Sequence, residues 1–454
     1  MKRNNLKVMA KSIRQAIIAV LVTAFVLTMF TATSIPVNAA ARNDKNKKGV
    51  LLESTIAGNT DILHELGVTQ ITYNLPLSLL TEGGGYPYKY KGVTYEFNRG
   101  TIGGYDSLIG KMNKAGISVT LIILNDWHGG DATLVHPLSR DFADANYYAF
   151  NTAEQAGMDK LEAVAQFLAE RYSGQMGVVD NWVIGNEVNA RQEWNYMTPS
   201  AGINTCAQEY AKALRLFYSV MTSHNPQARV YACIDHEWSA SDNAALHYGG
   251  KAFLNAMQTY ITQTGNFDYG IAIHPYNVPL YKADTWNAGR YATHKANSPY
   301  VTTANLDVLT VNVNHFFSCK ISLPRTVLTD YISQPAFLAP NGSVRSVICS
   351  EVPFNSIPYG GCYSDGAVQS AAAAYAYLAA ENNQHVDGIF LREMDSAVEV
   401  ATSGIAGGLI AADGTKKPAY MAYAGIDNPK TRGSIIQTMN AMAGRDLTKT
   451  TAAR

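Results

Sequence analysis

The chain has 454 residues, of which 47% are apolar and 16% charged, and its 36 basic side chains balance its 36 acidic ones. This length suffices for one large barrel or two ordinary domains, and the composition is that of a globular chain without long low-complexity runs. Its five cysteines are odd in number and widely spaced, which excludes both a zinc-binding pattern and a disulfide framework.

Residues 1–39 are typical of a signal peptide. Basic residues precede an apolar run from Ala16 to Phe30, and Val37-Asn38-Ala39 offers a small-residue cleavage site. This run is shorter than the roughly 20 residues of a membrane span, which disfavours the alternative of an uncleaved anchor. We therefore expect a secreted protein with no stable membrane insertion after cleavage. Removing five basic residues leaves 31 basic and 36 acidic groups, so no nucleic-acid partner is expected.

The rest of the chain alternates between two patterns. Residues 40–48 predict a solvated linker, residues 49–430 a single folded domain, and residues 431–454 a C-terminal tail. Eight short apolar segments predict strands, at 50–55, 68–74, 117–124, 178–186, 229–234, 267–273, 343–350 and 386–391. Helical patterns follow most of them, at 61–66, 102–115, 154–172, 204–223, 251–262, 305–317 and 366–381, with a final helix ending near 423.

This alternation predicts the α/β class with a parallel sheet, and eight units favour a (β/α)8 barrel. Loop insertions are expected after strands 2, 3 and 6, the first of them a hairpin or lid over 81–99 that is rich in Gly and Tyr. The alternative is an open doubly wound sheet. Such a sheet usually carries a Gly-rich phosphate loop after its first strand, and none is visible here.

Acidic side chains follow several predicted strands. In a barrel, the carboxyl ends of the strands form one mouth, where enzymes of this fold keep their chemistry. Cleavage of a glycosidic bond needs two carboxyl groups that flank the bond. The candidates are Glu53, Asp126, Glu187, Asp235, Glu237, Glu351, Glu393 and Asp395. We expect Glu187 and Glu351 to face each other across one cleft, and strict alternation along the strand to place Glu351, Cys349 and Val347 on one face.

Four short motifs resemble the retaining (β/α)8 glycoside hydrolases of the large "4/7" clan, whose catalytic carboxylates follow strands four and seven. They are Asn186-Glu187, His274-Pro275-Tyr276 after strand six, Glu351, and the segment from Gly408 to Tyr420 with its Asp-Gly and Lys-Pro-Ala-Tyr. The resemblance covers roughly residues 50–425. One departure is that Arg392 and its neighbours stand where many members carry a Trp after strand eight.

The resemblance implies a role for each matching residue. Glu187 would be the acid/base and Glu351 the nucleophile. Asn186 would hold the sugar 2-hydroxyl, while His274 and Tyr276 would orient the nucleophile. The resemblance also implies a β-linked oligo- or polysaccharide as substrate, and no cofactor or metal.

Other residues at the same predicted mouth are candidates for substrate contact. They are Asn125, Asp126, Trp127, Asp235, Trp238, Arg392 and Glu393. Stacking on a sugar is expected of Trp127 and Trp238, whereas Trp194 and Trp286 are expected to pack. Glu393 is the rival candidate for the nucleophile.

Other classes of function fit the sequence less well. A metal-dependent hydrolase would want a His-x-His on strand one or clustered ligands, and a serine hydrolase would want a Gly-x-Ser-x-Gly elbow; neither pattern is present. A non-catalytic carbohydrate-binding barrel on the same scaffold remains the alternative to an enzyme. A purely structural or adhesive protein is disfavoured, because the polar strand ends gather on one predicted rim.

Overall fold

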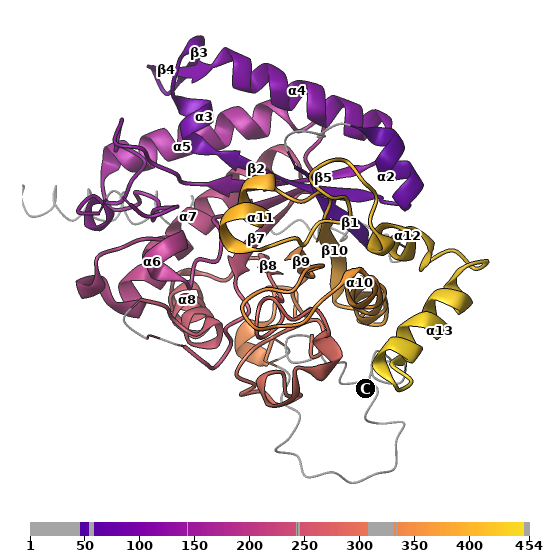
Figure 1. Ribbon diagram of the computed structural model, residues 1–454. Helices are drawn as coiled ribbons and strands as arrows, with labels where there is room; N and C mark the ends of the chain where they lie inside the picture. The colour runs from indigo at the N-terminus through magenta and orange to yellow at the C-terminus, as the bar shows by residue number, and fades with distance from the viewer. Residues whose placement is uncertain are drawn as a thin grey trace, which may run out of the picture. The chain divides into compact units, whose positions relative to one another are not determined.

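Eight parallel strands close into a barrel in the computed structural model, which describes residues 46–53, 59–142, 144–241, 243, 246–306, 331–332 and 334–448. Around the barrel the strands follow the order β1-β10-β9-β8-β7-β6-β5-β2, and every neighbouring pair is parallel. Helices surround these strands (Figure 1). The prediction of a (β/α)8 barrel is confirmed.

The strands are β1 (Lys48–Leu51), β2 (Gln70–Pro76), β5 (Ser118–Leu124), β6 (Asn181–Ile184), β7 (Arg229–Ile234), β8 (Gly270–Ile273), β9 (Val347–Val352) and β10 (Val386–Arg392). The helices are α2 (Thr60–Leu66), α3 (Leu77–Thr81), α4 (Arg99–Lys114), α5 (Gln155–Arg171), α6 (Arg191–Trp194), α7 (Gly202–His224), α8 (Gly250–Thr264), α10 (Gly366–Glu381), α11 (Ala397–Ser403), α12 (Pro418–Gly425) and α13 (Arg432–Ala443). An antiparallel hairpin, β3 (Gly85–Tyr90) and β4 (Val93–Asn98), follows α3.

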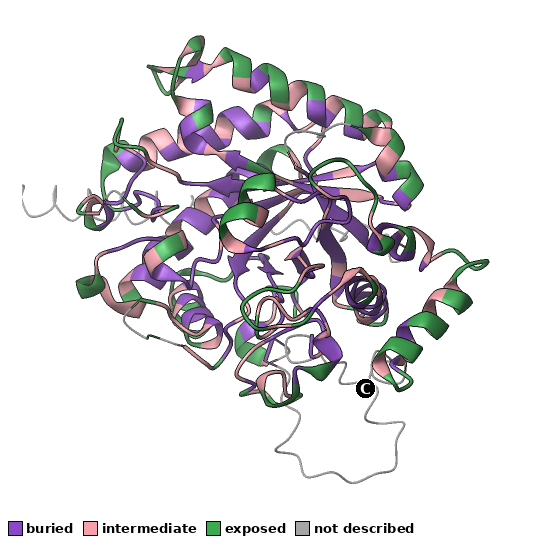
Figure 2. Ribbon diagram, viewed as in Figure 1, coloured by how far each residue is buried: buried purple, intermediate pink, exposed green. Residues whose placement is uncertain are grey.

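The barrel strands have two different faces because side chains alternate along a strand. One face fills the barrel with an interior layer of Leu51, Ile122, Leu124, Val183, Tyr231, Cys233, Ala272, Ile348 and Phe390. The other face packs against the helices in a larger outer layer, to which Trp182, Ile184 and Leu391 belong. The strands are therefore buried on both sides, whereas the outer helices keep one exposed face (Figure 2).

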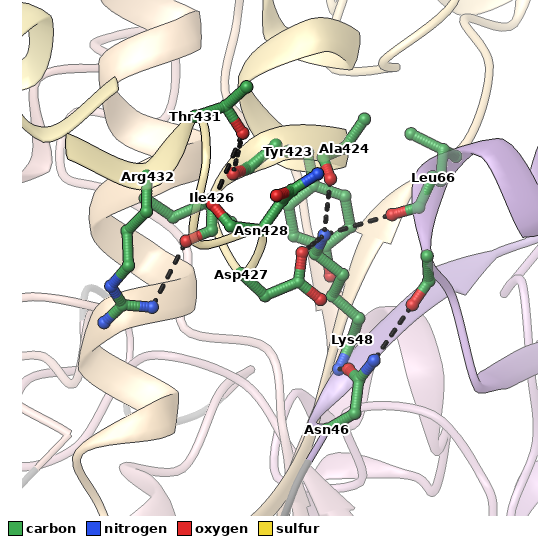
Figure 3. Close-up of polar contacts among 12 residues, drawn as sticks. Asn46, Lys48, Leu66, Tyr423, Ala424, Ile426, Asp427, Asn428, Thr431 and Arg432 are labelled. Carbon is green, nitrogen blue, oxygen red and sulfur yellow. Dashed lines mark hydrogen bonds and ion pairs between the residues drawn. The ribbon is translucent and has the colours of Figure 1, made fainter. Parts of the chain in front are cut away.

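Two buried lysines at the start of β1 bind the ends of packed helices. The Lys48 ammonium donates to the carbonyls of Leu66 and Ala424, each at 3.1 Å, and forms an ion pair of 2.5 Å with Asp427 (Figure 3). Burial lowers the pKa of Lys48, while Asp427 opposes this shift. Lys47 is also buried and donates to the end of α10. The prediction of a solvated linker is thus wrong at residues 47 and 48, because both lysines satisfy the carbonyls of packed helix ends.

The C-terminal part differs from the predicted tail. Residues 432–443 form α13, which lies beside α10 and α12 and buries Met439 against them. Hydrogen bonds from Arg432 to Glu381 fasten its first turn to α10. The predicted leader lies outside the described residues, as does nearly all of the helix predicted over 305–317. In the part of the chain that the structure describes, no helix combines the length and apolar character needed to cross a membrane.

Candidate active site

Glu187 leaves the carboxyl end of β6 on a tight left-handed turn. Gly185 has φ of 76° and Glu187 has φ of 41°, a region that costs a residue with a side chain about 1 kcal/mol or more. A Cβ on Gly185 would lie 2.8 Å from Val188, so the turn requires glycine there. Two backbone hydrogen bonds, from Gly185 to Ile123 and from Val188 to Cys233, hold the turn. A strained backbone turn therefore positions the Glu187 carboxyl group.

The Glu187 carboxyl group contacts a buried imidazole. His274 follows β8, is 1% exposed, and has its Nδ1 2.7 Å from Oε1 of Glu187. Burial raises the pKa of Glu187 above its usual value; the hydrogen bond from His274 opposes this shift, and the nearby Asp235 and Glu351 add to it. Burial alone would lower the pKa of His274, but Cys233 and the Glu187 carboxylate outweigh it and raise the pKa.

Glu351 reaches the same site from within β9. Residues Cys349 and Val352 pair with Ile389 and Leu391 of β10, so β9 holds one extra residue in this interval. This β-bulge overrides the predicted alternation. Val347 and Cys349 pack in the outer layer, yet Glu351 lines the mouth of the barrel. The expectation that these three residues share one face is wrong, because an extra residue re-aims the side chain that follows it.

A cation holds the Glu351 carboxylate. Arg392, at the end of β10, donates from Nη2 to Oε1 at 3.2 Å, and its other side forms an ion pair with Glu399 of α11. Burial alone would lower the pKa of Arg392, but the charges of Glu351 and Glu399 raise it above its usual value. Tyr276 lines the same cavity at the barrel mouth as Glu351, and burial, followed by the charges of Glu351 and Glu187, raises its pKa.

The two carboxyl groups lie close to each other, since both are near the same ring nitrogen of His274. Nδ1 of His274 lies 2.7 Å from Oε1 of Glu187 and 3.8 Å from Oε2 of Glu351. These two oxygens are therefore at most 6.5 Å apart, the sum of the two distances. The resemblance implied that His274 orients the nucleophile, but its ring lies closer to the acid/base candidate.

A cavity of about 340 Å³ opens over this pair. Its polar wall consists of Asn74, Asn186, Glu187, Glu351, Arg392 and Glu399. Three aromatic rings, Tyr147, Trp194 and Tyr276, form another part of the wall together with aliphatic side chains such as Leu124 and Leu280. Tyr147 and Trp194 lie 5.4 Å apart between ring centroids. Convergent polar groups beside apolar rings are typical of a ligand site.

The structure brings some sequence-predicted residues to this cavity and places others elsewhere. Asn186, Glu187, Tyr276, Glu351 and Arg392 line it, with His274 directly behind. Two others have structural partners. Asn125 is buried and donates from Nδ2 to three carbonyls of residues 134–149, and Asp126 accepts two hydrogen bonds from Ser78 beside a second cavity of about 530 Å³.

The predicted roles of two tryptophans are reversed. Trp238 is 1% exposed, packs edge-on against Tyr331 and donates to the carbonyl of Ala296, so it offers no face to a sugar and the predicted stacking role is wrong. Trp127 packs on Tyr148 and does not line the cavity. Trp194, which was expected to pack, lines the cavity instead.

Asp235 and Glu393 take different positions. Asp235 accepts a hydrogen bond from Asn189 and lies 2.5 Å from Nε2 of His247. Burial alone would lower the pKa of His247, but Asp235 outweighs it and raises the pKa to about 9. Glu393 directly follows β10 and does not line the cavity. It is fully buried, and burial raises its pKa to about 8.

Four residues near the pair were not singled out from the sequence as contacts of the catalytic groups. Tyr147 and Trp194 lie in a long loop and in the short helix α6, and Glu399 lies in α11. Cys233 in the interior layer contacts both Glu187 and His274. No local motif marks these residues, because each reaches the site from a different part of the chain. Among the described residues, no group of three or more His, Cys, Asp or Glu side chains is placed to hold a metal ion.

Comparisons with known proteins place this geometry in context. A family model described as a family of unknown function, DUF5722, matches residues 40–318 and 325–450. A search of curated proteins gave no match. Several solved structures share the fold. A family 39 glycoside hydrolase from the gut symbiont Bacteroides cellulosilyticus WH2 is 18% identical with a TM-score of 0.53; the match covers 86% of this chain and 64% of that protein, less than two thirds of its length.

Two further structures have similar scores. A β-glucosidase from the hyperthermophile Pyrococcus furiosus is 11% identical, with a TM-score of 0.53 and coverage of 86% of this chain and 87% of that one. A β-glycosidase from the hyperthermophile Thermosphaera aggregans is 10% identical, with a TM-score of 0.51 and coverage of 84% and 87%. At such low identity, the likeness shows the barrel fold and assigns no activity.

Proposed function

This chain belongs to the family of unknown function DUF5722, and we propose that it is a secreted, retaining glycoside hydrolase that acts on β-linked sugars. The observation that carries the proposal is the placement of Glu187 and Glu351 in one cavity at the barrel mouth, with the same His274 nitrogen within 3.8 Å of both. Two carboxyl groups that flank one small space are the machinery of glycoside hydrolysis.

The separation of the pair supports retention. Retaining enzymes hold their carboxyl groups about 5–5.5 Å apart, whereas inverting enzymes leave about 6.5–9.5 Å for a water between them. The upper limit of 6.5 Å between Oε1 of Glu187 and Oε2 of Glu351 lies at the lower edge of the inverting range. It supports direct attack by one carboxylate on the sugar.

In the proposed first step, Glu187 donates a proton to the glycosidic oxygen while Glu351 attacks the anomeric carbon. The bond to the leaving sugar breaks, and a covalent glycosyl–enzyme forms at Glu351. In the second step, Glu187 removes a proton from a water, which attacks the same carbon and releases Glu351. Two inversions at one carbon give net retention.

The surroundings support this division of roles. Burial raises the pKa of Glu187, as a group that must carry a proton to the leaving oxygen requires. Arg392 donates to Glu351, as an attacking carboxylate requires. Asn186 also lines the cavity and is proposed to bind the sugar 2-hydroxyl. Tyr147 and Trp194 line the cavity and are proposed to pack against the sugar.

A test begins with turnover. Purified protein lacking residues 1–39 would be assayed on nitrophenyl β-glycosides of glucose, galactose, xylose and mannose and on soluble β-glucans, xylans and mannans. Proton NMR of the first product formed reports its anomeric configuration, and a β-product from a β-substrate would establish retention. A fluorinated sugar that traps the glycosyl–enzyme should then label Glu351, which peptide mass spectrometry would locate.

Other outcomes separate the alternatives. An α-configured first product would overturn retention. Sugar binding without turnover on any glycoside, unchanged in Glu187→Gln and Glu351→Gln, would indicate a carbohydrate-binding barrel instead of an enzyme. Recovery of protein beginning near residue 40 from the culture medium would test secretion, and retention of the leader in the cell membrane would contradict it.

A further inference from the structure

A buried thiol lies directly behind the proposed acid/base. Cys233 is on β7, belongs to the interior layer and is 0% exposed. Its Sγ accepts a hydrogen bond from the backbone N–H of Glu187 at 3.5 Å and lies 3.4 Å from Nε2 of His274. Because Nδ1 of His274 contacts the Glu187 carboxyl group, the three residues form a closed ring of contacts.

The thiol can satisfy the imidazole in either charge state. When His274 is charged, Nε2–H donates to Sγ; when the ring is neutral with its proton on Nδ1, Nε2 accepts from S–H. A thiol is both a weak donor and a weak acceptor, so neither state leaves a buried nitrogen without a partner. In both states, Nδ1–H still points at Glu187.

This matters because Glu187 must change its charge during the proposed reaction, losing a proton in the first step and regaining one in the second. Around His274 lie the charged or titratable groups Glu187 after β6, Glu351 in β9, Cys233 in β7, and His236 after β7. Of these, only Cys233 is recorded in contact with Nε2 among the described residues. The same thiol also holds the backbone of the strained Glu187 turn.

We propose that Cys233 is a positioning residue of the proposed glycosidase, whose thiol holds the His274 ring and the Glu187 backbone together so that Glu187 can give up and regain its proton in place. The inference rests on the proposed function and deepens it. It adds a residue that touches no substrate and acts through His274 and Glu187.

The test compares Cys233→Ala, Cys233→Ser and a matched control, Cys349→Ala. Cys349 is an equally buried thiol in β9, two strands along the barrel from β7, but its side chain packs in the outer layer. Cys233→Ala should lower kcat at least about tenfold with little change in KM, because the acid loses its alignment. Without the thiol, which helps to raise the pKa of His274, the imidazole should lose its charge at lower pH. The alkaline limb of the pH–rate profile should then shift to higher pH, because the charged His274 opposes the raised pKa of Glu187.

Rescue distinguishes positioning from packing. A serine hydroxyl is also donor and acceptor, so Cys233→Ser should recover most of kcat and the original pH profile, even if its stability is lower. Cys349→Ala should lose stability and keep the pH profile. If Cys233→Ala retains the wild-type kcat and pH profile, or if Cys233→Ser behaves like Cys233→Ala, the proposal is wrong.

A second measurement does not depend on turnover. Nitrogen NMR of protein labelled at histidine would follow the two ring nitrogens of His274 as the pH changes. The titration of His274 should move to lower pH in Cys233→Ala and stay in place in Cys349→Ala. An unchanged His274 titration in Cys233→Ala would overturn the positioning role. Absence of turnover in the wild type, together with the expected NMR shift, would instead refute the glycosidase proposal alone.

Discussion

Glu187 and Glu351 share one imidazole neighbour, but the chain holds them in different ways. Glu187 lies beyond its strand on a left-handed turn, with a thiol behind its backbone and a buried ring on its carboxyl group. Glu351 lies within its strand, is turned inward by one extra residue, and accepts a hydrogen bond from a guanidinium that Glu399 anchors. Their side chains are 10% and 17% exposed, so burial alone hardly distinguishes them.

The comparison teaches that the partners, more than the position on the rim, set the chemistry of a strand-end carboxyl group. One side of the site provides desolvation and an imidazole that can exchange a proton. The other side provides a permanent cation, because a guanidinium stays charged at every physiological pH. A site with one group of each kind can separate proton transfer from nucleophilic attack.

The largest expected effect is the loss of the attacking group. Glu351→Gln removes the charge that, in the proposed mechanism, forms the bond to the sugar, and it keeps the shape of the side chain, so kcat should fall by at least about 10⁴-fold. Steady-state rates on an aryl β-glycoside would measure this. A fall of less than about tenfold would assign attack to another group.

Glu187→Gln should show a smaller effect that depends on the substrate. The first step should slow by roughly 10²- to 10³-fold when the leaving group is a sugar, which needs a proton, and far less when it is a dinitrophenolate, which does not. Single-turnover rates on the two kinds of substrate would measure the difference. Equal losses on both would contradict the acid role of Glu187.

Arg392→Gln should lower kcat less than these two substitutions, because it removes a partner of the Glu351 carboxylate and leaves Glu187 unchanged. The substitution removes the guanidinium between Glu351 and Glu399, so two carboxylates would face each other without a cation, and kcat should fall roughly 10- to 100-fold. Glu399→Gln keeps the guanidinium and serves as the control, with a change below about tenfold. The expected contrast fails if both variants retain full activity.

The smallest expected effect concerns stability and a third carboxyl group, Glu393, which takes no part in the proposed chemistry. Burial raises its pKa to about 8, opposed by the backbone N–H of Glu53. Since the folded state binds this proton more tightly than the unfolded state, the stability that it contributes is present below about pH 4.5 and is lost as the pH rises to about 8. Glu393→Gln should therefore raise the melting temperature by a few degrees at pH 8 and leave it unchanged near pH 4.5.

Thermal unfolding of Glu393→Gln and the wild type at both pH values would measure this. Equal melting temperatures at pH 8 would show that Glu393 is solvated in the folded protein. Unchanged kcat at neutral pH is expected as well, because Glu393 does not line the cavity.

Much of the fold could be predicted from the sequence because the barrel repeats a local pattern. Apolar runs such as 117–124 and 229–234 coincide with β5 and β7, and the polar residues that end them gather at one mouth, as parallel strands require. The helix α13 was missed, since its residues 432–443 bury little apart from Met439. Its hold on α10 comes from Arg432 and Glu381, which lie 51 positions apart in the chain.

Less of the candidate site could be predicted from the sequence, because its contacts join residues that are distant in the chain. Asn186 and Glu187 follow an apolar strand and could be selected from that context. The face of Glu351 could not be derived by counting, because the extra residue in β9 depends on its pairing with β10. The different places of Trp194 and Trp238 likewise depend on which distant ring or loop covers each indole. Such contacts leave no periodic trace in the sequence.

The contact between Lys48 and Asp427 indicates that the connectivity of the chain can be changed without changing the barrel. It places the first strand beside the segment that follows α12, so the two ends of the barrel are neighbours although they lie 379 positions apart. The turn at Lys91 and Gly92 is exposed, and its β3–β4 hairpin lies away from α12 (Figure 1). A circular permutant that joins the old ends by a flexible linker and opens the chain at that turn is expected to close the same barrel.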